Sequence, residues 1–527
     1  MVNYDSDQRG KLVQYLNDES NIVRNGHADR LYMPINESEV SQILKDANAT
    51  GVPVTISGAG TGISGGRVPL TGWILATDQM KSISKSNAEL WTEPETKDEF
   101  SIKFNEIDET HATMTIPVSM RLKSLQILVR EKRWFYPPDP TEGTSFLGGN
   151  VSTNASGARS FKFSATRKWI QGLRVVLANG TILDLDRDKQ QGYVDADYVV
   201  IQTDNYSNKV PRPKYSLPKV TKHVAGPVIT DSSHPLDLFI GTNGIFGVVT
   251  EITVKLIRPP TSIYSMFVYL ASVEDSFKLV RFCQSQRATS IFPVPMSVEF
   301  MDEKSILLLR SKDDRINPNA KAIIMIEQDV YSDDELERSM EFWAEQLDKY
   351  SVIDTDVAQT HAEIEHHKFL RHYLAEYIIG QSRSYNQSLI VSDYSVPEEK
   401  YPEFFHFLIK IGVQFENEIA NETTISQDSP GYTLFGHAGD CHPHLTLLPR
   451  THAQSVYANQ LVTAVLNKTI ELGGSIASEH GLGKKKFGSK PALFFQYGEI
   501  GLQAVRQMKE RIDPNMILCP GNLIPSN

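Results

Sequence analysis

Two short segments near the C-terminus carry residues whose types and spacing suit metal chemistry. His437, His442 and His444 lie within eight consecutive positions, and Glu479 precedes His480 on a loop flanked by glycines. Two histidines and one glutamate, with further positions left open, are how proteins hold a catalytic divalent cation. A further histidine beside such an ion can move protons. The two segments therefore predict metal-assisted chemistry.

The spacing leaves some roles open. A turn containing Gly439 separates His437 from His444 and allows both rings to converge on one ion, although most histidines are simply hydrogen-bonded without a metal. His442 lies between them, where a fourth ligand, a group behind the ligands or a substrate contact would all fit. Cys441 beside it suits either a reactive thiol or a structurally buried one.

Composition and charge exclude several classes of function. The 527 residues are 40% hydrophobic and 22% charged, so a soluble protein of two or more domains is expected. A net charge of −11 argues against nucleic-acid binding, and the densest basic cluster, Lys484–Lys486, suits local anion binding within a glycine loop. Three unpaired cysteines, no signal peptide and no membrane-spanning run favour a cytoplasmic protein, with peripheral membrane contact left open.

Glycine-rich stretches recur three times in the first half of the chain. A helix predicted between Asn36 and Gly51 leads to a short strand and the stretch 58–66. The second stretch is 148–158, and the third, 238–250, is predicted to begin with a strand at 238–241. Between the last two, residues 186–234 are polar and contain prolines, which is typical of an insertion over a pocket.

The pattern changes after Pro259 and Pro260, where we place a domain boundary. Strands then alternate with longer helices, which predicts an α+β domain with a mixed or mostly antiparallel sheet. A strand at 432–435 is expected to deliver His437 to its end. A last helix is predicted near residues 500–508.

The glycine stretches favour a large anionic cofactor. Glycine lets backbone amides converge on a pyrophosphate without obstruction by side chains, although any one stretch is as well explained by tight turns. Three stretches interleaved with Asn, Ser and Thr favour the cofactor.

These motifs together resemble a known family. Residues 53–66, 137–157 and 238–250, followed by 436–444, 478–486 and 513–521, are similar in order to the FAD-linked D-2-hydroxyacid dehydrogenases. That family includes D-lactate dehydrogenase, the glycolate oxidase flavoprotein subunit and D-2-hydroxyglutarate dehydrogenase. The resemblance implies a two-subdomain FAD-binding domain of the vanillyl-alcohol-oxidase type plus an α+β cap domain. The expected division is residues 1–259 for FAD, 260–499 for substrate and metal, and 500–527 returning to the FAD domain.

The resemblance also implies site residues. His437, His444 and Glu479 would hold a divalent metal, zinc first with iron or manganese as alternatives, and His480 would be the proton-transfer residue. With no histidine in the glycine stretches, non-covalent FAD is expected. The residues implied for FAD binding are Gly58, Ala59, Gly60, Thr61, Gly62, Pro138, Gly148, Gly149, Asn154, Ser156, Gly157, Gly244 and Val249.

Arg371 lies on a predicted helix where the family has an arginine that pairs with the substrate carboxylate. A solvated helix face is an equally good explanation. The implied reaction is oxidation of a 2-hydroxyacid to a 2-oxoacid, with a hydride passing to flavin N5. The three cysteines cannot ligate an iron–sulfur cluster, so electrons would pass to a separate partner such as a quinone, a cytochrome or an electron-transfer flavoprotein.

The sequence departs from the family pattern at several positions. Ser57 replaces an arginine before the first glycine stretch, Cys441-His442 replaces Gly-Asn, Asn243 replaces a glutamate and Asn522 a lysine. These departures keep open a flavin-binding homologue without catalysis. A second alternative is a transferase like alkylglycerone-phosphate synthase, although the compact histidine run expected there is absent here.

Overall fold

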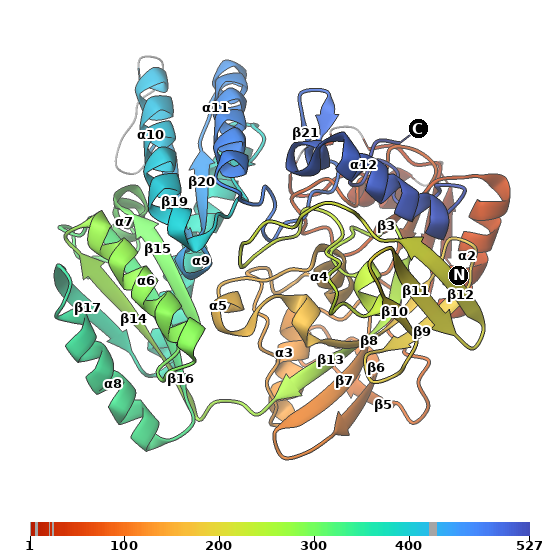
Figure 1. Ribbon diagram of the computed structural model, residues 1–527, viewed down its shortest axis with the longest axis horizontal. Helices are drawn as coiled ribbons and strands as arrows, with labels where there is room; N and C mark the ends of the chain where they lie inside the picture. Colours follow the sequence, from red (N-terminus) through yellow and green to blue (C-terminus); the bar gives the residue numbers. More distant parts are fainter. Residues whose placement is uncertain (1, 6–8, 21, 24–25, 421–428, 527) are drawn as a thin grey trace.

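The chain folds into two lobes that meet along a broad interface (Figure 1). The structure, a computed structural model, describes residues 2–5, 9–20, 22–23, 26–420 and 429–526. The first lobe carries the glycine stretches, and the second is built around one large sheet. Pro259 and Pro260 lie in the connection between the lobes, after the strand that ends at Ile257.

A small sheet opens the first lobe and positions the first glycine stretch. Asn36 accepts a hydrogen bond from the Glu39 amide at the start of the helix, and Gly51 ends it in the left-handed conformation, as predicted. The strand before the glycine stretch is confirmed too. The elements of this layer are α1 (Arg9–Leu12), α2 (Glu37–Thr50) and the sheet β1 (Val2–Asp5), β2 (Arg30–Met33), β4 (Trp73–Ala76) and β3 (Val54–Ser57).

An antiparallel six-stranded sheet forms the rest of the first lobe, and the second glycine stretch forms a short helix packed against it. The sheet runs β5 (Glu89–Thr92), β6 (Glu99–Glu106), β7 (His111–Pro117), β13 (Val248–Ile257), β8 (Ile170–Val176) and β9 (Ile182–Asp186). Its helices are α3 (Leu122–Glu131), α4 (Leu147–Thr153) and α5 (Ser160–Phe163).

The polar insertion contains its own small sheet of β10 (Gly192–Val194), β11 (Tyr198–Thr203) and β12 (Tyr206–Pro211). The prediction of a strand at 238–241 is wrong, because a 3-10 helix, η4, covers Pro235–Phe239. Pro235 fixes the first helical φ, and the Asp237 carboxylate accepts the backbone N–H of His234. Local capping therefore overrides the apolar pattern.

The second lobe is an antiparallel seven-stranded sheet covered by helices, as predicted for the cap domain. The sheet runs β17 (Val352–Ala358), β14 (Ser262–Leu270), β16 (Ala322–Val330), β15 (Ser297–Asp302), β19 (Tyr432–His437), β20 (His442–Leu447) and β18 (Ile390–Val391). The helices are α6 (Val273–Thr289), α7 (Glu303–Arg310), α8 (Asp333–Leu347), α9 (His361–Ser384), α10 (Tyr401–Ile419) and α11 (His452–Glu471).

The C-terminal segment lies on the first lobe (Figure 1). A hairpin of β21 (Lys486–Phe487) and β22 (Lys490–Pro491) precedes α12 (Ala492–Ile512), which packs on β12. The Cys519 amide then donates to the Val54 carbonyl beside β3. Among the described residues, no helix has the length and apolar character needed to cross a membrane.

A buried carboxylate in the cap gives a pH-dependent stability. Asp302 caps α7 and accepts hydrogen bonds from the amide and hydroxyl of Ser305, and burial raises its pKa to about 6. Because this pKa lies above the unfolded value, the native state loses stability as pH rises from about 4 to 6. Asp302→Asn keeps the cap without the buried charge, so we expect it to be more stable at pH 7.5 by up to about 3 kcal/mol.

Thermal unfolding at pH 4 and pH 7.5 measures this effect. The gain should appear at pH 7.5 and vanish at pH 4, where both side chains are neutral. Asp334→Asn on the exposed face of α8 is the control and should show no such difference. An equal change in the stability of Asp302→Asn at both pH values would contradict the raised pKa of Asp302.

Candidate metal and cofactor site

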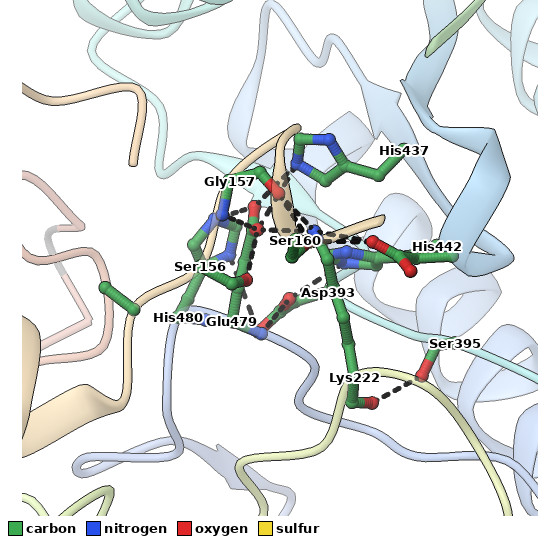
Figure 2. A network of polar contacts seen from close by, with 12 residues as sticks. Ser156, Gly157, Ser160, Lys222, Asp393, Ser395, His437, His442, Glu479 and His480 are labelled. Carbon is green, nitrogen blue, oxygen red and sulfur yellow. Dashed lines mark hydrogen bonds and ion pairs between the residues drawn. The ribbon is translucent and has the colours of Figure 1, made fainter. Parts of the chain in front are cut away.

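Three histidines converge at a tight hairpin of the cap sheet, and Figure 2 labels two of them, His437 and His442. His437 ends β19 and pairs in register with His442 at the start of β20. His442 and His444 lie two residues apart on one strand, so both side chains point to the same face. The predicted turn between them closes through Cys441, whose φ of 52° is left-handed. One donor atom each from His437, His442, His444 and Glu479 lies within 4.8 Å of every other.

Hydrogen bonds orient two of the imidazoles toward Glu479. His437 Nδ1 lies 2.8 Å from Glu299 Oε1, and His444 Nδ1 lies 3.1 Å from the carbonyl oxygen of Ser392. The opposite nitrogens face the carboxylate of Glu479, with His437 Nε2 at 3.2 Å and His444 Nε2 at 3.4 Å. Binding one ring nitrogen to protein and leaving the other for an ion is the usual arrangement of metal-ligating histidines.

Glu479 is held by groups from the first lobe (Figure 2). Its Oε2 accepts hydrogen bonds from the hydroxyl of Ser156 at 3.2 Å and the amide of Gly157 at 3.3 Å. Lys222 of the insertion places its Nζ at 3.3 Å from the same oxygen. Burial alone would raise the pKa of Glu479, but His437 and Lys222 outweigh burial and hold it well below its usual value. The carboxylate therefore stays ionised, as a metal ligand must be.

Asp393 fixes the segment that carries Glu479 and His480. The Glu479 amide donates to Asp393 Oδ1 at 3.1 Å, and the His480 amide donates to Oδ2 at 3.0 Å. The His480 ring lies between two carboxylates, with Nδ1 at 3.5 Å from Asp393 Oδ2 and Nε2 at 3.3 Å from Glu479 Oε1. The side chain is 24% exposed, so His480 is reachable from outside while its neighbours are buried.

His442 is fully buried and faces Asp393. Its Nε2 lies 3.0 Å from Asp393 Oδ1, but the two are poorly aligned, and neither ring nitrogen makes a hydrogen bond with any described residue. Burial lowers the pKa of His442 to about 3, which keeps the ring neutral. The neighbouring Cys441 thiol is buried with Gln284 Nε2 at 3.1 Å, and burial raises its pKa. Of the two alternatives for Cys441, the structure favours the buried one.

The residues of this cluster fit a divalent cation. Imidazole nitrogens and a carboxylate are the donors that zinc and other first-row metals prefer, and unpartnered buried nitrogens are costly unless a ligand satisfies them. A bound ion would also separate the two imidazoles from the carboxylate they now approach. The structure thus brings together all three residues predicted as ligands, and it adds His442 to them.

Arg371 does not lie on a solvated helix face. It is 8% exposed, its Nε donates to Glu299 Oε2 at 2.8 Å, and its guanidinium lies 4.9 Å from the ring of Phe435. Glu299 therefore connects Arg371 to His437. These three residues line a cavity between the lobes, whose walls come from α3, α9 and β15. Arg371 is thus positioned beside the cluster, as a substrate contact would have to be.

A second cavity lies among the glycine stretches of the first lobe. It is lined by these residues predicted for FAD: Gly58, Ala59, Gly60, Thr61, Gly62, Gly148, Gly149, Gly244 and Val249. Four other predicted residues are not in its wall: Pro138, Asn154, Ser156 and Gly157. Asn154 instead accepts a hydrogen bond from the Arg167 amide, and the last two bind Glu479.

The cavity fits a large cofactor that needs close backbone approach. A Cβ built on Gly62 or Gly149 meets no atom within 4 Å, so both positions face open space. Gly60 has a φ of 89°, and a Cβ there would lie 2.2 Å from Arg67 Nη1. The left-handed φ therefore favours glycine at Gly60, and the absence of side chains at the other two positions leaves the cavity unobstructed. The lining contains no histidine or cysteine among the described residues.

The loop after His480 joins the two sites. The Gly483 amide donates to Asn243 Oδ1 at 2.6 Å, and Asn243 lines the cavity among the glycine stretches. Lys484 is buried and donates to Gly66 O and Asn522 Oδ1, and burial lowers its pKa to about 8. Lys484 thus contacts neutral oxygens of the first lobe, and anion binding by this basic cluster stays a prediction.

Several functional neighbours were missed from the sequence. Glu299 is a buried carboxylate between the apolar residues Val298 and Phe300 of β15, and this mismatch was a usable signal. Arg371 was predicted as a site residue, and its burial follows from the stripe of α9 that repeats every three or four residues. Lys222 lies in a polar stretch, and Asp393 follows a two-residue strand, so neither was recognisable.

Comparisons with known proteins match the two halves of the chain to two family descriptions. Residues 259–523 match the family described as FAD linked oxidases, C-terminal domain. Residues 28–94 and 99–186 match the family described as FAD binding domain. The fold is also that of alkyldihydroxyacetonephosphate synthase, with a TM-score of 0.63 and 13% identity over 98% of this chain and 83% of that one. The predicted fold class is confirmed.

Curated relatives are similar over nearly their full length. Glycolate oxidase subunit GlcD of Bacillus subtilis is 28% identical, covering 99% of this chain and 94% of the relative. A D-lactate dehydrogenase of Anaerostipes hadrus is 27% identical, covering 97% and 92%. A D-2-hydroxyglutarate dehydrogenase of Stutzerimonas stutzeri is 23% identical, covering 94% and 90%.

Proposed function

Because the chain belongs to the family of FAD-linked oxidases, we propose that it oxidises a D-2-hydroxyacid to the corresponding 2-oxoacid. One observation carries this proposal. A cluster of ion-binding residues with a reachable histidine is anchored to the loop that borders the glycine-lined cavity. The names of the relatives support it, since glycolate, D-lactate and D-2-hydroxyglutarate are all 2-hydroxyacids.

The chain's own residues divide the reaction between them. His437, His444 and Glu479 would hold a divalent ion, zinc first with iron or manganese as alternatives, which supplies positive charge beside the substrate hydroxyl. Non-covalent FAD, held by the glycine-lined cavity, supplies the acceptor for the α-hydrogen and its two electrons. Arg371 would face the substrate carboxylate from the wall of the cavity between the lobes.

His480 is the proposed general base. Asp393 lies on the Nδ1 side of the ring and favours a proton there, which leaves Nε2 to take the proton of the substrate hydroxyl. The carboxylates of Asp393 and Glu479 then stabilise the imidazolium that forms. The hydrogen bond that the His480 backbone amide donates to Asp393 holds the residue in place during this transfer. We further propose that the electrons leave for a separate acceptor such as a quinone, a cytochrome or an electron-transfer flavoprotein.

Anaerobic mixing of the holoenzyme with a panel of acids tests the proposal. We expect flavin absorbance to bleach with at least one of D-lactate, glycolate and D-2-hydroxyglutarate, and not with the L-enantiomers of the chiral acids. The reason is that a 2-hydroxyacid donates its α-hydrogen only when its hydroxyl and carboxylate are both held.

A metal-depleted sample of the same enzyme is the matched control. Its FAD should remain bound while bleaching slows, and restoring the ion should restore the rate. Full bleaching by a verified metal-free sample would contradict the role of the ion. No bleaching with any acid would contradict the oxidation and leave the transferase or the non-catalytic alternative.

A further inference from the structure

We infer that His442 is a fourth protein ligand of the ion held by His437, His444 and Glu479. The inference rests on the metal site of the proposed function and goes beyond it, because three ligands would suffice for that function. It assigns a role to the residue that departs from the family pattern within the first histidine segment.

The position of His442 in the hairpin carries the first step. His437 and His442 are register partners across β19 and β20, and their ring centroids lie 5.4 Å apart. His444 follows on the same face of the strand, with its ring centroid 4.4 Å from that of His442. The ring of His442 therefore cannot leave the cluster without breaking the hairpin. Its donor atom lies within 4.8 Å of the donor atom of each of the other three residues.

The unsatisfied nitrogens of His442 carry the second step. The side chain has 0% exposure, Nδ1 has no hydrogen-bond partner among the described residues, and Nε2 has only the poorly aligned Asp393 Oδ1 at 3.0 Å. A buried polar atom without a partner destabilises the folded state. An ion bound by this ring would remove that cost. Without an ion in the cluster, this cost of burying the imidazole would not be offset.

The carboxylate of Asp393 carries the third step. Its Oδ1 lies 3.0 Å from His442 Nε2, and a carboxylate behind an imidazole fixes the ring and raises its strength as a ligand. His437 likewise has a buried carboxylate behind it, since its Nδ1 makes a 2.8 Å hydrogen bond with Glu299 Oε1. Two imidazoles of the cluster are thus each backed by a buried carboxylate.

The inferred donor set is three imidazole nitrogens and one carboxylate. Such a set favours zinc, cobalt or nickel over magnesium or calcium, which prefer oxygen ligands. It would also leave fewer positions for substrate oxygens than a three-ligand site. Cobalt has a visible spectrum that zinc lacks, so a change of ligand at the ion can be followed without measuring activity.

Metal titration of metal-depleted enzyme tests the inference. The Zn²⁺ affinity of His442→Asn, measured by competition with a chromophoric chelator, should fall by more than about 100-fold, because loss of even a supporting partner of a ligand costs about 10–100-fold. His367→Asn is the matched control, since His367 is equally buried but bonds Ser265 and lies next to Asp356 in the cap sheet. It should bind Zn²⁺ like the wild type.

A ligand-replacing variant tests direct contact with the ion. Co²⁺-loaded His442→Cys should show a thiolate-to-cobalt charge-transfer band that the Co²⁺-loaded wild type lacks. A role in packing alone would not produce this band. The variant also decides the question if His442→Asn fails to fold.

Three outcomes would overturn the inference. They are a wild type that takes up no ion, a His442→Asn affinity within about 10-fold of the wild type, and Co²⁺-loaded His442→Cys without the band. Bleaching of the wild-type flavin by a 2-hydroxyacid is measured separately. The proposed oxidation can therefore stand or fall independently of His442.

Discussion

His480→Ala enzyme should retain its FAD and bind its metal, yet its flavin should be reduced by substrate about 10²–10⁴-fold more slowly than in the wild type. The hydroxyl proton must leave for the α-hydrogen to depart, and the only imidazole of the site with appreciable exposure is His480. Without this ring, no imidazole remains between Asp393 and Glu479 to accept the proton of the substrate hydroxyl. Stopped-flow absorbance under anaerobic conditions measures the rate directly.

His366→Ala is the control for this prediction. His366 is also a partly exposed imidazole beside a carboxylate, with Nε2 at 2.7 Å from Asp313 Oδ2, but it lies on α9 outside the cluster. Its flavin should be reduced at the wild-type rate. A near-normal rate in His480→Ala would show that another group takes the proton.

Gly149→Leu should fold normally and lose FAD. A Cβ at Gly149 meets no atom within 4 Å, and leucine suits the helix α4 better than glycine does. The side chain would enter the glycine-lined cavity and occupy space that the cofactor needs. Overpacking of a filled site costs about 1–3 kcal/mol, which corresponds to roughly 5- to 150-fold weaker FAD binding. The ratio of flavin to protein absorbance after purification measures the loss.

Gly380→Leu provides the matched comparison. Gly380 also lies in a helix, α9, where a Cβ meets no atom within 4 Å, but it is outside the cavity. This variant should keep its full flavin content. If Gly149→Leu kept FAD as well, the cavity would not be the cofactor site.

The sequence predicted those parts of the fold in which local chemistry decides. Asn36 and Gly51 bound α2 as expected, and the loop residue Cys441 closes the turn that brings His437 and His444 together. These features depend on hydrogen bonds and backbone angles within a few residues. The 3-10 helix at Pro235–Phe239 was missed although its cause is local too, because the apolar run that follows Pro235 suggested a strand.

The surroundings of the cluster could not be predicted in the same way. Glu299 and Lys222 contact His437 and Glu479 across separations of 138 and 257 residues, and nothing in their local sequence states the partner. Arg371 was predictable as a buried residue from the spacing of Ile364, Arg371 and Ile378 on α9. Its ion pair with Glu299 was not, because the partner comes from a strand of the cap sheet.

If Glu479 ligates the ion as proposed, its attachment to the first lobe would link occupancy of the two sites thermodynamically. The carboxylate that would ligate the ion is positioned by Ser156 and Gly157, which continue the stretch whose first glycines border the FAD cavity. A dinucleotide that orders this stretch also pre-organises the ion's anionic ligand. By reciprocity, the factor by which flavin tightens the ion equals the factor by which the ion tightens flavin. Loss of one group should then weaken, without abolishing, the binding of the other.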